Sequence, residues 1–258
     1  MLLLADVGNT ETTFGLAKGD AVVHHWRVTT DAARTPDEVF LLLRGLLAAS
    51  DVPVGAVRGA AIGSVVPSVT GPLAEAAARL SGKPAVVVDG HSRLGITLAV
   101  DEPMTVGADR IINTLAASRI YAADCIVVDL GTATTYDCIT ADGVFLGGVI
   151  QPGVRTSAET LFRRTSKLPA TELVAPDKVI GTRTEDCIRS GVVYGAADSV
   201  DGLVRRIKKA WPRAQVPRVI ATGGLAAVIH PHCTEIDQVE PDLTLHGLRM
   251  AHAMLSVE

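Results

Sequence analysis

Residues 126–135 read IVVDLGTATT, so three branched apolar residues run directly into Asp129. Such a run predicts a buried strand and places Asp129 where that strand leaves the core. Gly131 permits a tight turn that an anion can approach closely. Three hydroxyl donors follow it: Thr132, Thr134 and Thr135. A carboxylate, a glycine turn and clustered hydroxyls in this order predict a phosphate-binding turn.

The same pattern occurs at the start of the sequence, where LLLA leads into Asp6 and then into Gly8 and Thr10. The two aspartates lie about half the chain apart. An ordinary strand followed by a glycine turn explains either copy alone. Two copies in matching positions favour an internal duplication.

A third polar group combines an acid with a base. The string Gly107-Ala108-Asp109-Arg110 precedes apolar residues at helical spacing, so Asp109 lies at or near the start of a helix. One interpretation makes Asp109 a plain helix cap. The other makes it a general base that accepts a proton from a bound hydroxyl, with Arg110 gripping a carboxylate or phosphate. The residues alone leave both open.

The remaining reactive side chains predict little chemistry. The glycines in residues 147–153 (GGVIQPG) indicate a backbone approached by a ligand or, equally, tight packing. The four cysteines have no C-x-x-C spacing and are expected to be reduced core thiols, and His230-x-His232 is too sparse to predict a metal site.

The elements that must position these groups follow from the apolar periodicity. Thr35-Pro36 is typical of a helix start, and Thr184 is expected to cap a later helix. Expected strands, in residue numbers, are 2–5, 12–16, 21–28, 57–66, 85–88, 125–128, 135–140, 144–147 and 219–221. Expected helices are 39–49, 69–80, one from 111, 154–164, one or two in 185–210, and 245–255.

Composition narrows the class of protein. A chain of 258 residues that is 48% hydrophobic can bury one large core or two cores of about half that size. The net charge of −4 and the absence of long basic runs argue against a nucleic-acid partner. We expect neither a signal peptide nor a membrane span, and hence a cytoplasmic protein.

The order of the motifs resembles the duplicated ribonuclease-H-like fold of actin, sugar kinases and heat-shock ATPases. Asp6-x-Gly8, Asp129-x-Gly131 and Thr222-Gly223-Gly224 match, in order, its two phosphate turns and its nucleoside turn. The resemblance implies an α/β protein with the nucleotide cleft between two such domains, which we expect at residues 1–115 and 116–258.

The longer strings resemble type III pantothenate kinase over nearly the whole chain. They are DVGNT at Asp6, GADR at Gly107, DLGTATT at Asp129, GGVIxPG at Gly147 and ATGGL at Ala221. This resemblance implies an ATP-dependent kinase that converts pantothenate to 4′-phosphopantothenate, the first step of coenzyme A biosynthesis. It also implies a homodimer whose substrate site is completed across the interface.

The resemblance assigns roles residue by residue. Asp109 would be the general base, and Asp129 would bind a monovalent cation, K⁺ or NH₄⁺, while Mg²⁺ accompanies the ATP. Residues expected to bind pantothenate are Gly107, Ala108, Asp109, Arg110 and, from the partner subunit, Thr184. Residues expected to bind ATP are Asp6, Val7, Gly8, Asn9, Thr10, Glu11, Thr12, Thr13 and Thr132.

One departure concerns the substrate. Family members often carry a tyrosine that contacts pantothenate where this chain has Val100, so one hydroxyl contact is missing or comes from elsewhere. Losing one hydrogen bond costs about 1 kcal/mol. The alternatives are a kinase for another small hydroxy acid and an ATP-binding accessory protein on the same fold. The presence of Asp6, Asp109, Asp129 and Thr184 argues against the latter.

Overall fold

The computed structural model describes residues 1–256, which form two compact units. The first unit contains residues 1–120 and 143–145 together with the C-terminal stretch that begins at Asp242. The second contains residues 121–142 and 146–241. Division of the chain into domains at residue 115 remains a prediction.

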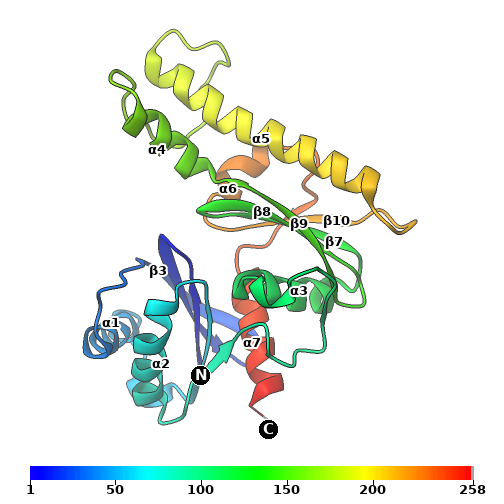
Figure 1. The fold of residues 1–258 in the computed structure, drawn as a ribbon. Coiled ribbons are helices and arrows are strands. Elements are labelled where there is room, and N and C mark those ends of the chain that lie inside the picture. The colour runs from blue at the N-terminus through cyan, green and yellow to red at the C-terminus, as the bar shows by residue number, and fades with distance from the viewer. Residues whose placement is uncertain (257–258) are drawn as a thin grey trace. The chain divides into compact units, whose positions relative to one another are not determined.

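The first unit is built on a five-stranded sheet with the order β3-β2-β1-β4-β5 (Figure 1). β1 to β3 form an antiparallel meander, and β4 and β5 continue the sheet in parallel with β1. The strands are β1 (Leu2–Val7), β2 (Glu11–Lys18), β3 (Ala21–Thr29), β4 (Gly59–Ser64) and β5 (Val86–Val88).

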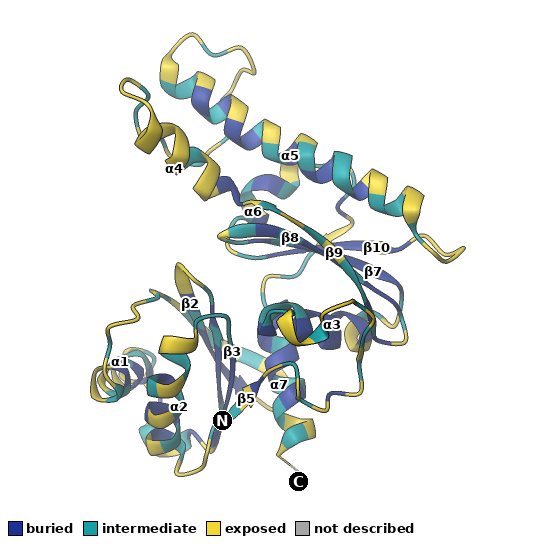
Figure 2. Ribbon diagram, in the orientation of Figure 1, coloured by how far each residue is buried: buried dark blue, intermediate teal, exposed yellow. Residues whose placement is uncertain are grey.

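Helices cover both faces of this sheet, and side chains along β1 alternate between the two faces. Leu3 and Val7 join the core cluster that contains residues of α1 (Pro36–Ala49) and α2 (Pro67–Ser81). Leu4 joins the cluster on α3 (Ala108–Tyr121) and α7 (Leu243–Leu255). A strand that is apolar at consecutive positions is therefore needed, and four of the six residues of β1 are buried. Along α2, by contrast, buried and exposed residues alternate (Figure 2).

The start of α1 confirms the prediction of a helix cap. Thr35 accepts a hydrogen bond from the Glu38 amide and Glu38 reaches back to the Thr35 amide, which completes a capping box. Pro36 occupies the first turn, where its missing N–H costs nothing. Between β5 and α3 the chain is largely irregular, with a two-residue strand β6 (Thr97–Leu98) that pairs with Val144 and Phe145 of the first unit.

Five strands of the second sheet repeat the strand order of the first, as β9-β8-β7-β10-β11, and β6 is a sixth strand next to β9. β7 and β8 are antiparallel, and β10 and β11 run parallel to β7. The strands are β7 (Cys125–Leu130), β8 (Ala133–Ile139), β9 (Val144–Pro152), β10 (Arg218–Thr222) and β11 (Gln238–Val239). Asp6 and Asp129 are each the second-last residue of the equivalent strand, β1 or β7. The expected duplicated ribonuclease-H-like fold is confirmed.

The helices of the second unit are α4 (Val154–Arg164), α5 (Thr184–Ala210) and the short α6 (Ala226–Ile229). α5 is one continuous helix of 27 residues whose buried residues, such as Val193 and Val200, pack on apolar side chains of β7 and β10. Figure 1 shows α5 crossing this sheet with α4 beside its N-terminal half.

Two local expectations in this unit were wrong. β9 continues through Gly147 and Gly148 to Pro152, because Gly147 tolerates its φ of 107° without interrupting the strand. Thr184 does not cap α5: Arg183 occupies the cap position without a side-chain hydrogen bond, and Thr184 is the first helical residue.

The cysteines are less uniform than expected. Cys125 is buried, which raises its pKa to about 12, whereas Cys187 is exposed and donates to the Gly181 carbonyl. No helix within residues 1–256 combines the length and the apolar character needed to span a membrane.

Candidate active site

The first aspartate turn joins β1 to β2. Asp6 lies in β1 opposite Thr13 of β2, and the Gly8 amide donates to the Glu11 carbonyl oxygen at 3.0 Å, which closes the turn. Val7 and Thr12 are buried, whereas Asn9, Thr10 and Glu11 form an exposed tip. The structure therefore gathers the eight predicted ATP-binding residues of this stretch in one hairpin, with backbone amides at its tip.

The predicted substrate-binding string lies at the start of α3. Asp109 is the second residue of the helix, and its Oδ1 accepts the Arg110 amide at 2.8 Å. A Cβ on Gly107 would collide with the same Oδ1, so glycine at this position leaves room for the folded-back carboxylate. The Arg110 guanidinium lies over the Phe145 ring, 4.9 Å from its centroid, which fixes the guanidinium plane.

The electrostatic environment of Asp109 suits a proton acceptor. Burial raises the pKa of Asp109 above its ordinary value, while the Arg110 amide and charge act in the opposite direction. A carboxylate with a raised pKa holds a proton more readily than an exposed aspartate does. Asp109 thus satisfies a helix amide as a cap would and also has the protonation chemistry of a base.

Val65 connects these two parts of the first unit. Its amide donates to the Val7 carbonyl at 3.0 Å, directly behind the first aspartate turn. Its Cγ1 lies 3.4 Å from the place where a Cβ on Gly107 would stand. The sequence string SVVPS around Val65 predicted no functional role, yet this residue contacts both the first aspartate turn and the segment that carries Asp109.

The second aspartate turn is packed against two glycines. The Asp129 carboxylate lies against Gly223, which has φ 89° at the end of β10. Gly153, at the start of α4, lies against the Gly131 and Thr132 carbonyls, so that a Cβ there would meet both oxygens. Among the glycines of residues 147–153, Gly153 therefore reflects tight packing around the turn that carries Asp129 and Thr132.

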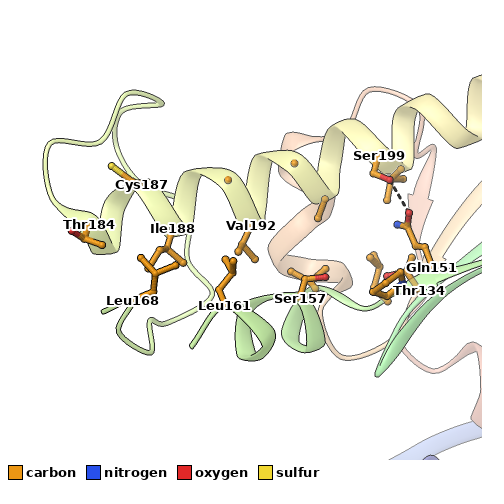
Figure 3. A pocket seen from close by; sticks show the side chains of 17 residues that line it. Thr134, Gln151, Ser157, Leu161, Leu168, Thr184, Cys187, Ile188, Val192 and Ser199 are labelled. Atoms are coloured by element: carbon orange, nitrogen blue, oxygen red, sulfur yellow. Dashed lines mark hydrogen bonds between the residues drawn. The ribbon is translucent and has the colours of Figure 1, made fainter. Parts of the chain in front are cut away.

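Two of the predicted threonines line a cavity: Thr134, which flanks this turn and pairs with Leu130, and Thr184. Thr134 is 1% exposed, and its hydroxyl has no hydrogen-bond partner and lies at the wall of a cavity of about 700 Å³ between α4 and α5. Thr184 lines the opposite end of the same cavity, near Cys187 and Leu168 (Figure 3). The second unit therefore does not bring Thr184 next to Asp129 or Thr132.

The polar end of this cavity is a short hydrogen-bond chain. Ser199 donates to Gln151 Oε1 at 2.7 Å (Figure 3). Gln151 Nε2 in turn donates to the Tyr136 hydroxyl at 3.0 Å. The cavity walls are mostly apolar elsewhere, with Leu161, Ile188 and Val192 among them, although Ser157 also lines the cavity. Within residues 1–256, no three His, Cys, Asp or Glu side chains gather as a potential metal-binding group.

Two threonines outside the predicted motifs donate hydrogen bonds to the aspartate turns, and the sequence patterns did not identify them. Thr30 donates to the Gly8 carbonyl and Thr156 to the Thr132 carbonyl, each at 2.7 Å. These residues are 22 and 24 positions from their acceptors, so no local spacing could reveal the contacts.

The family model and the individual relatives that this chain matches belong to the same family. The family model described as type III pantothenate kinase matches residues 2–206. A type III pantothenate kinase of Acidothermus cellulolyticus is 45% identical over 251 residues, 97% of each chain.

Solved structures show the fold alone. The activator of the 2-hydroxyisocaproyl-CoA dehydratase from Clostridium difficile, with bound ADPNP, has a TM-score of 0.58 at 12% identity. The match covers all of this chain and 97% of the activator chain. The ROK hexokinase from Thermus thermophilus has a TM-score of 0.52 at 13% identity, covering 100% and 99% of the two chains.

Proposed function

The chain belongs to the type III pantothenate kinase family, and from this premise we propose how its residues divide the work of the reaction. It is an ATP-dependent kinase that phosphorylates pantothenate in the first step of coenzyme A biosynthesis. The observation that carries the assignment of roles is the Asp109 carboxylate, which has a raised pKa and lies in the same unit as an aspartate turn.

Asp109 is the general base in this proposal. Phosphoryl transfer to an alcohol needs positioning and charge neutralisation more than covalent chemistry, and a carboxylate orients the hydroxyl and accepts its proton late. The pantothenate primary hydroxyl oxygen bonds to the γ-phosphorus while the bond from that phosphorus to the β,γ-bridging oxygen breaks, so that ADP leaves, and the hydroxyl proton passes to the Asp109 carboxylate. Gly107, Ala108 and Arg110 surround this group, and Arg110 would pair with the pantothenate carboxylate.

The two aspartate turns hold the ATP phosphates. The hairpin tip from Asp6 to Thr13 and the turn at Thr132 present backbone amides and hydroxyls, which are suited to phosphate oxygens. Asp6 would face the Mg²⁺ of the nucleotide through water. The equivalent positions of Asp6 and Asp129, near the ends of β1 and β7, support this role for the two turns.

Cations complete the charge balance. Oxygen ligands suit Mg²⁺ and monovalent ions, and the Asp129 carboxylate at Gly223 lies in a space that a Cβ would fill. Asp129 would therefore hold K⁺ or NH₄⁺ together with nearby backbone oxygens, and Mg²⁺ would bind chiefly to the phosphates. Bound cations supply charge neutralisation for the transferred phosphoryl group.

A homodimer would complete the substrate site through Thr184. Apolar side chains are exposed on α4 and on the segment that precedes α5, with Phe162 at 49% and Ile180 at 84%. Exposed apolar patches of this kind commonly mark protein contacts. We place the enzyme in the cytoplasm, where ATP is available as the phosphoryl donor.

Subunit mixing tests the role of Thr184. Asp109→Asn and Thr184→Ala proteins, each impaired alone, are mixed under conditions that exchange subunits. If Thr184 acts across the interface, a mixed dimer regains one intact site and activity returns. Activity that stays at the level of the separate variants would place Thr184 and Asp109 in one subunit's site or exclude a role for Thr184.

The test of the function is ATP consumption by the purified protein with Mg²⁺, with and without pantothenate, in potassium and in sodium buffer. We expect turnover that requires pantothenate and is faster with potassium. Turnover that depends on pantothenate equally in both buffers would overturn the Asp129 cation site only. ATP binding without pantothenate-dependent turnover would favour the accessory-protein alternative or a change in specificity around Val100.

A further inference from the structure

We propose that Thr30 and Thr156 are positioning residues, each of which holds one backbone carbonyl so that the next amide faces an ATP phosphate. Neither residue lies in a predicted ATP-binding motif, and neither is proposed to touch the nucleotide. The inference rests on the proposed function of the two aspartate turns. It adds the residues that fix the conformation of those turns.

In the first unit, Thr30 follows β3 and reaches the hairpin that carries Asp6. Its hydroxyl donates to the Gly8 carbonyl at 2.7 Å, and its amide donates to the Thr10 carbonyl at 2.9 Å. Thr30 therefore binds the turn at two points, on either side of Asn9.

The hydroxyl of Thr12 completes this arrangement. Its oxygen lies 2.8 Å from the Thr30 hydroxyl oxygen. A threonine hydroxyl has one proton, and that of Thr30 is given to Gly8, so Thr12 must donate to Thr30. Thr12 is 3% exposed, and its proton thus supports the turn from inside. The chain of bonds runs from Thr12 through Thr30 to the Gly8 carbonyl.

In the second unit, α4 supplies the equivalent contact from a different element. The Thr156 hydroxyl, in the first turn of α4, donates to the Thr132 carbonyl at 2.7 Å. Gly153, at the cap position of the same helix, packs against the same carbonyl and against that of Gly131. α4 therefore holds the second turn both by contact and by a hydrogen bond.

The planar peptide bond explains why a held carbonyl matters to a ligand. The C=O of one residue and the N–H of the next lie in one rigid plane and point in opposite directions. Holding the Gly8 oxygen toward Thr30 aims the Asn9 amide away from Thr30. Holding the Thr132 oxygen toward α4 aims the Ala133 amide away from α4. Successive fixed amides of this kind form anion-binding sites.

The two contacts arise independently, which strengthens the inference. Thr30 follows a strand and Thr156 lies in a helix, yet each hydroxyl meets a carbonyl two or three residues beyond the aspartate of its turn, at the same 2.7 Å. Valine keeps the branched shape of threonine and lacks the hydroxyl. At Thr156 it removes the bond to the Thr132 carbonyl, and at Thr30 it removes the bond to the Gly8 carbonyl together with the acceptor of the Thr12 hydroxyl.

The experiment compares Thr30→Val and Thr156→Val with wild type in the full-length protein. We expect the KM for ATP and the Kd for a non-hydrolysable ATP analogue to rise about threefold to tenfold, the effect of one net hydrogen bond. The KM for pantothenate should change less than twofold. Thr30→Ser and Thr156→Ser, which keep the hydroxyl, should restore the ATP constants to within about twofold of wild type.

Matched controls come from the same elements. Thr29 is the exposed neighbour of Thr30, and Thr160 lies one turn after Thr156 with its hydroxyl on the Thr156 carbonyl of the helix. Thr29→Val and Thr160→Val should leave both ATP constants unchanged. Thermal unfolding of every variant identifies any valine variant that does not fold. An alanine variant at the same position then takes its place.

The outcomes separate this inference from the proposed function. Folded valine variants with wild-type ATP constants would overturn the inference while pantothenate-dependent turnover of the wild type persists. Equal weakening toward ATP and pantothenate, or failure of the serine variants to recover, would indicate a merely structural role. If wild type shows no pantothenate-dependent turnover, the proposed function fails, and the analogue Kd still decides whether the threonines act on nucleotide binding.

Discussion

The carboxylate of Asp129 lies against the α-carbon of Gly223, in the space that a side chain on Gly223 would occupy. Two strands create this contact, because Asp129 near the end of β7 pairs with Thr222 at the end of β10. The Leu225 amide also donates to the Leu130 carbonyl at 3.2 Å, which ties the two turns together. The position of the proposed cation ligand therefore depends on a residue without a side chain.

Gly223→Ala should disable the enzyme at this contact. Its φ of 89° disfavours any side chain, and the added methyl would displace the Asp129 carboxylate or the Leu130 backbone. We expect loss of potassium stimulation, a fall in turnover of at least tenfold, and destabilisation by about 1–3 kcal/mol. Steady-state kinetics in potassium and sodium buffers and chemical unfolding measure these effects.

Gly202→Ala is the control for that substitution. Gly202 lies inside α5 with open space where a Cβ would stand, so alanine should stabilise the helix by up to about 1 kcal/mol and leave turnover intact. Potassium stimulation preserved in Gly223→Ala would contradict the proposed dependence of Asp129 on this glycine.

Asp109→Asn should abolish most phosphorylation while ATP binding stays near the wild-type level. Asparagine keeps the shape and can still accept the Arg110 amide, but it cannot accept the substrate proton. Because burial disfavours the charged form of Asp109, the variant should be as stable as wild type at neutral pH or more stable. Turnover, calorimetric ATP binding and thermal unfolding test this, with exposed Asp101→Asn as the control. Undiminished turnover would exclude Asp109 as the base.

The pH dependence of kcat/KM for pantothenate should reveal the same group. Asp109 must be ionised to act as a base, so activity falls as the pH drops through its pKa. Because burial raises that pKa, the acidic limb should lie above 3.8, the ordinary value of an aspartate. Rate profiles in overlapping buffers, restricted to pH values at which the protein remains folded, provide the measurement. A limb at or below 3.8 would contradict the assignment.

Asp201 should be important for stability rather than for turnover. This buried residue of α5 accepts the amides of Thr234 and Glu235 at 2.8 and 3.0 Å, together with the Thr234 hydroxyl. Asp201→Ala leaves those amides without their acceptor and should lower the free energy of unfolding by about 2–4 kcal/mol. Urea unfolding measures the loss, and exposed Asp198→Ala on the same helix should have little effect.

The same measurements made at lower pH test the charge of Asp201. Burial acts to raise the pKa of Asp201, but the hydrogen bonds from Thr234 and Glu235 outweigh it and hold the pKa below its ordinary value. The stabilisation is therefore present above the ordinary aspartate pKa and is lost as the pH falls through the lowered one. The difference between wild type and Asp201→Ala should shrink on acidification; a difference that grows would contradict this.

The sequence predicted those parts of the fold that depend on local chemistry. Thr35 and Pro36 start a helix by hydrogen bonding within four residues, and the apolar run before Asp129 forms a strand in any buried sheet. The prediction failed where tertiary contacts override local preference. β9 extends through Gly147-Gly148 because neighbouring strands support it, and Arg183 rather than Thr184 takes the cap of α5.

The candidate site was predictable in its charged residues but not in its supports. Asp6 and Asp129 stand out because the same pattern of strand, aspartate and glycine occurs twice, and Asp109 stands out because it lies beside Arg110 at a helix start. Thr30 and Thr156 carry no such signal, since a threonine after a strand or in a helix is ordinary. Only the fold brings their hydroxyls to carbonyls more than 20 positions away.

The packing of α7 on β1 bears on the synthesis of the chain. Leu4 of β1 and Leu245 and Leu248 of α7 belong to one core cluster, although about 240 residues separate them. A ribosome that adds about 5–20 residues per second needs roughly 12–50 seconds to make that stretch, whereas chain collapse takes microseconds. α3 is already available on this face, but the part of the face that α7 covers stays exposed until the entire second unit has been made. Translation, rather than the folding rate, sets the moment at which the first unit is complete.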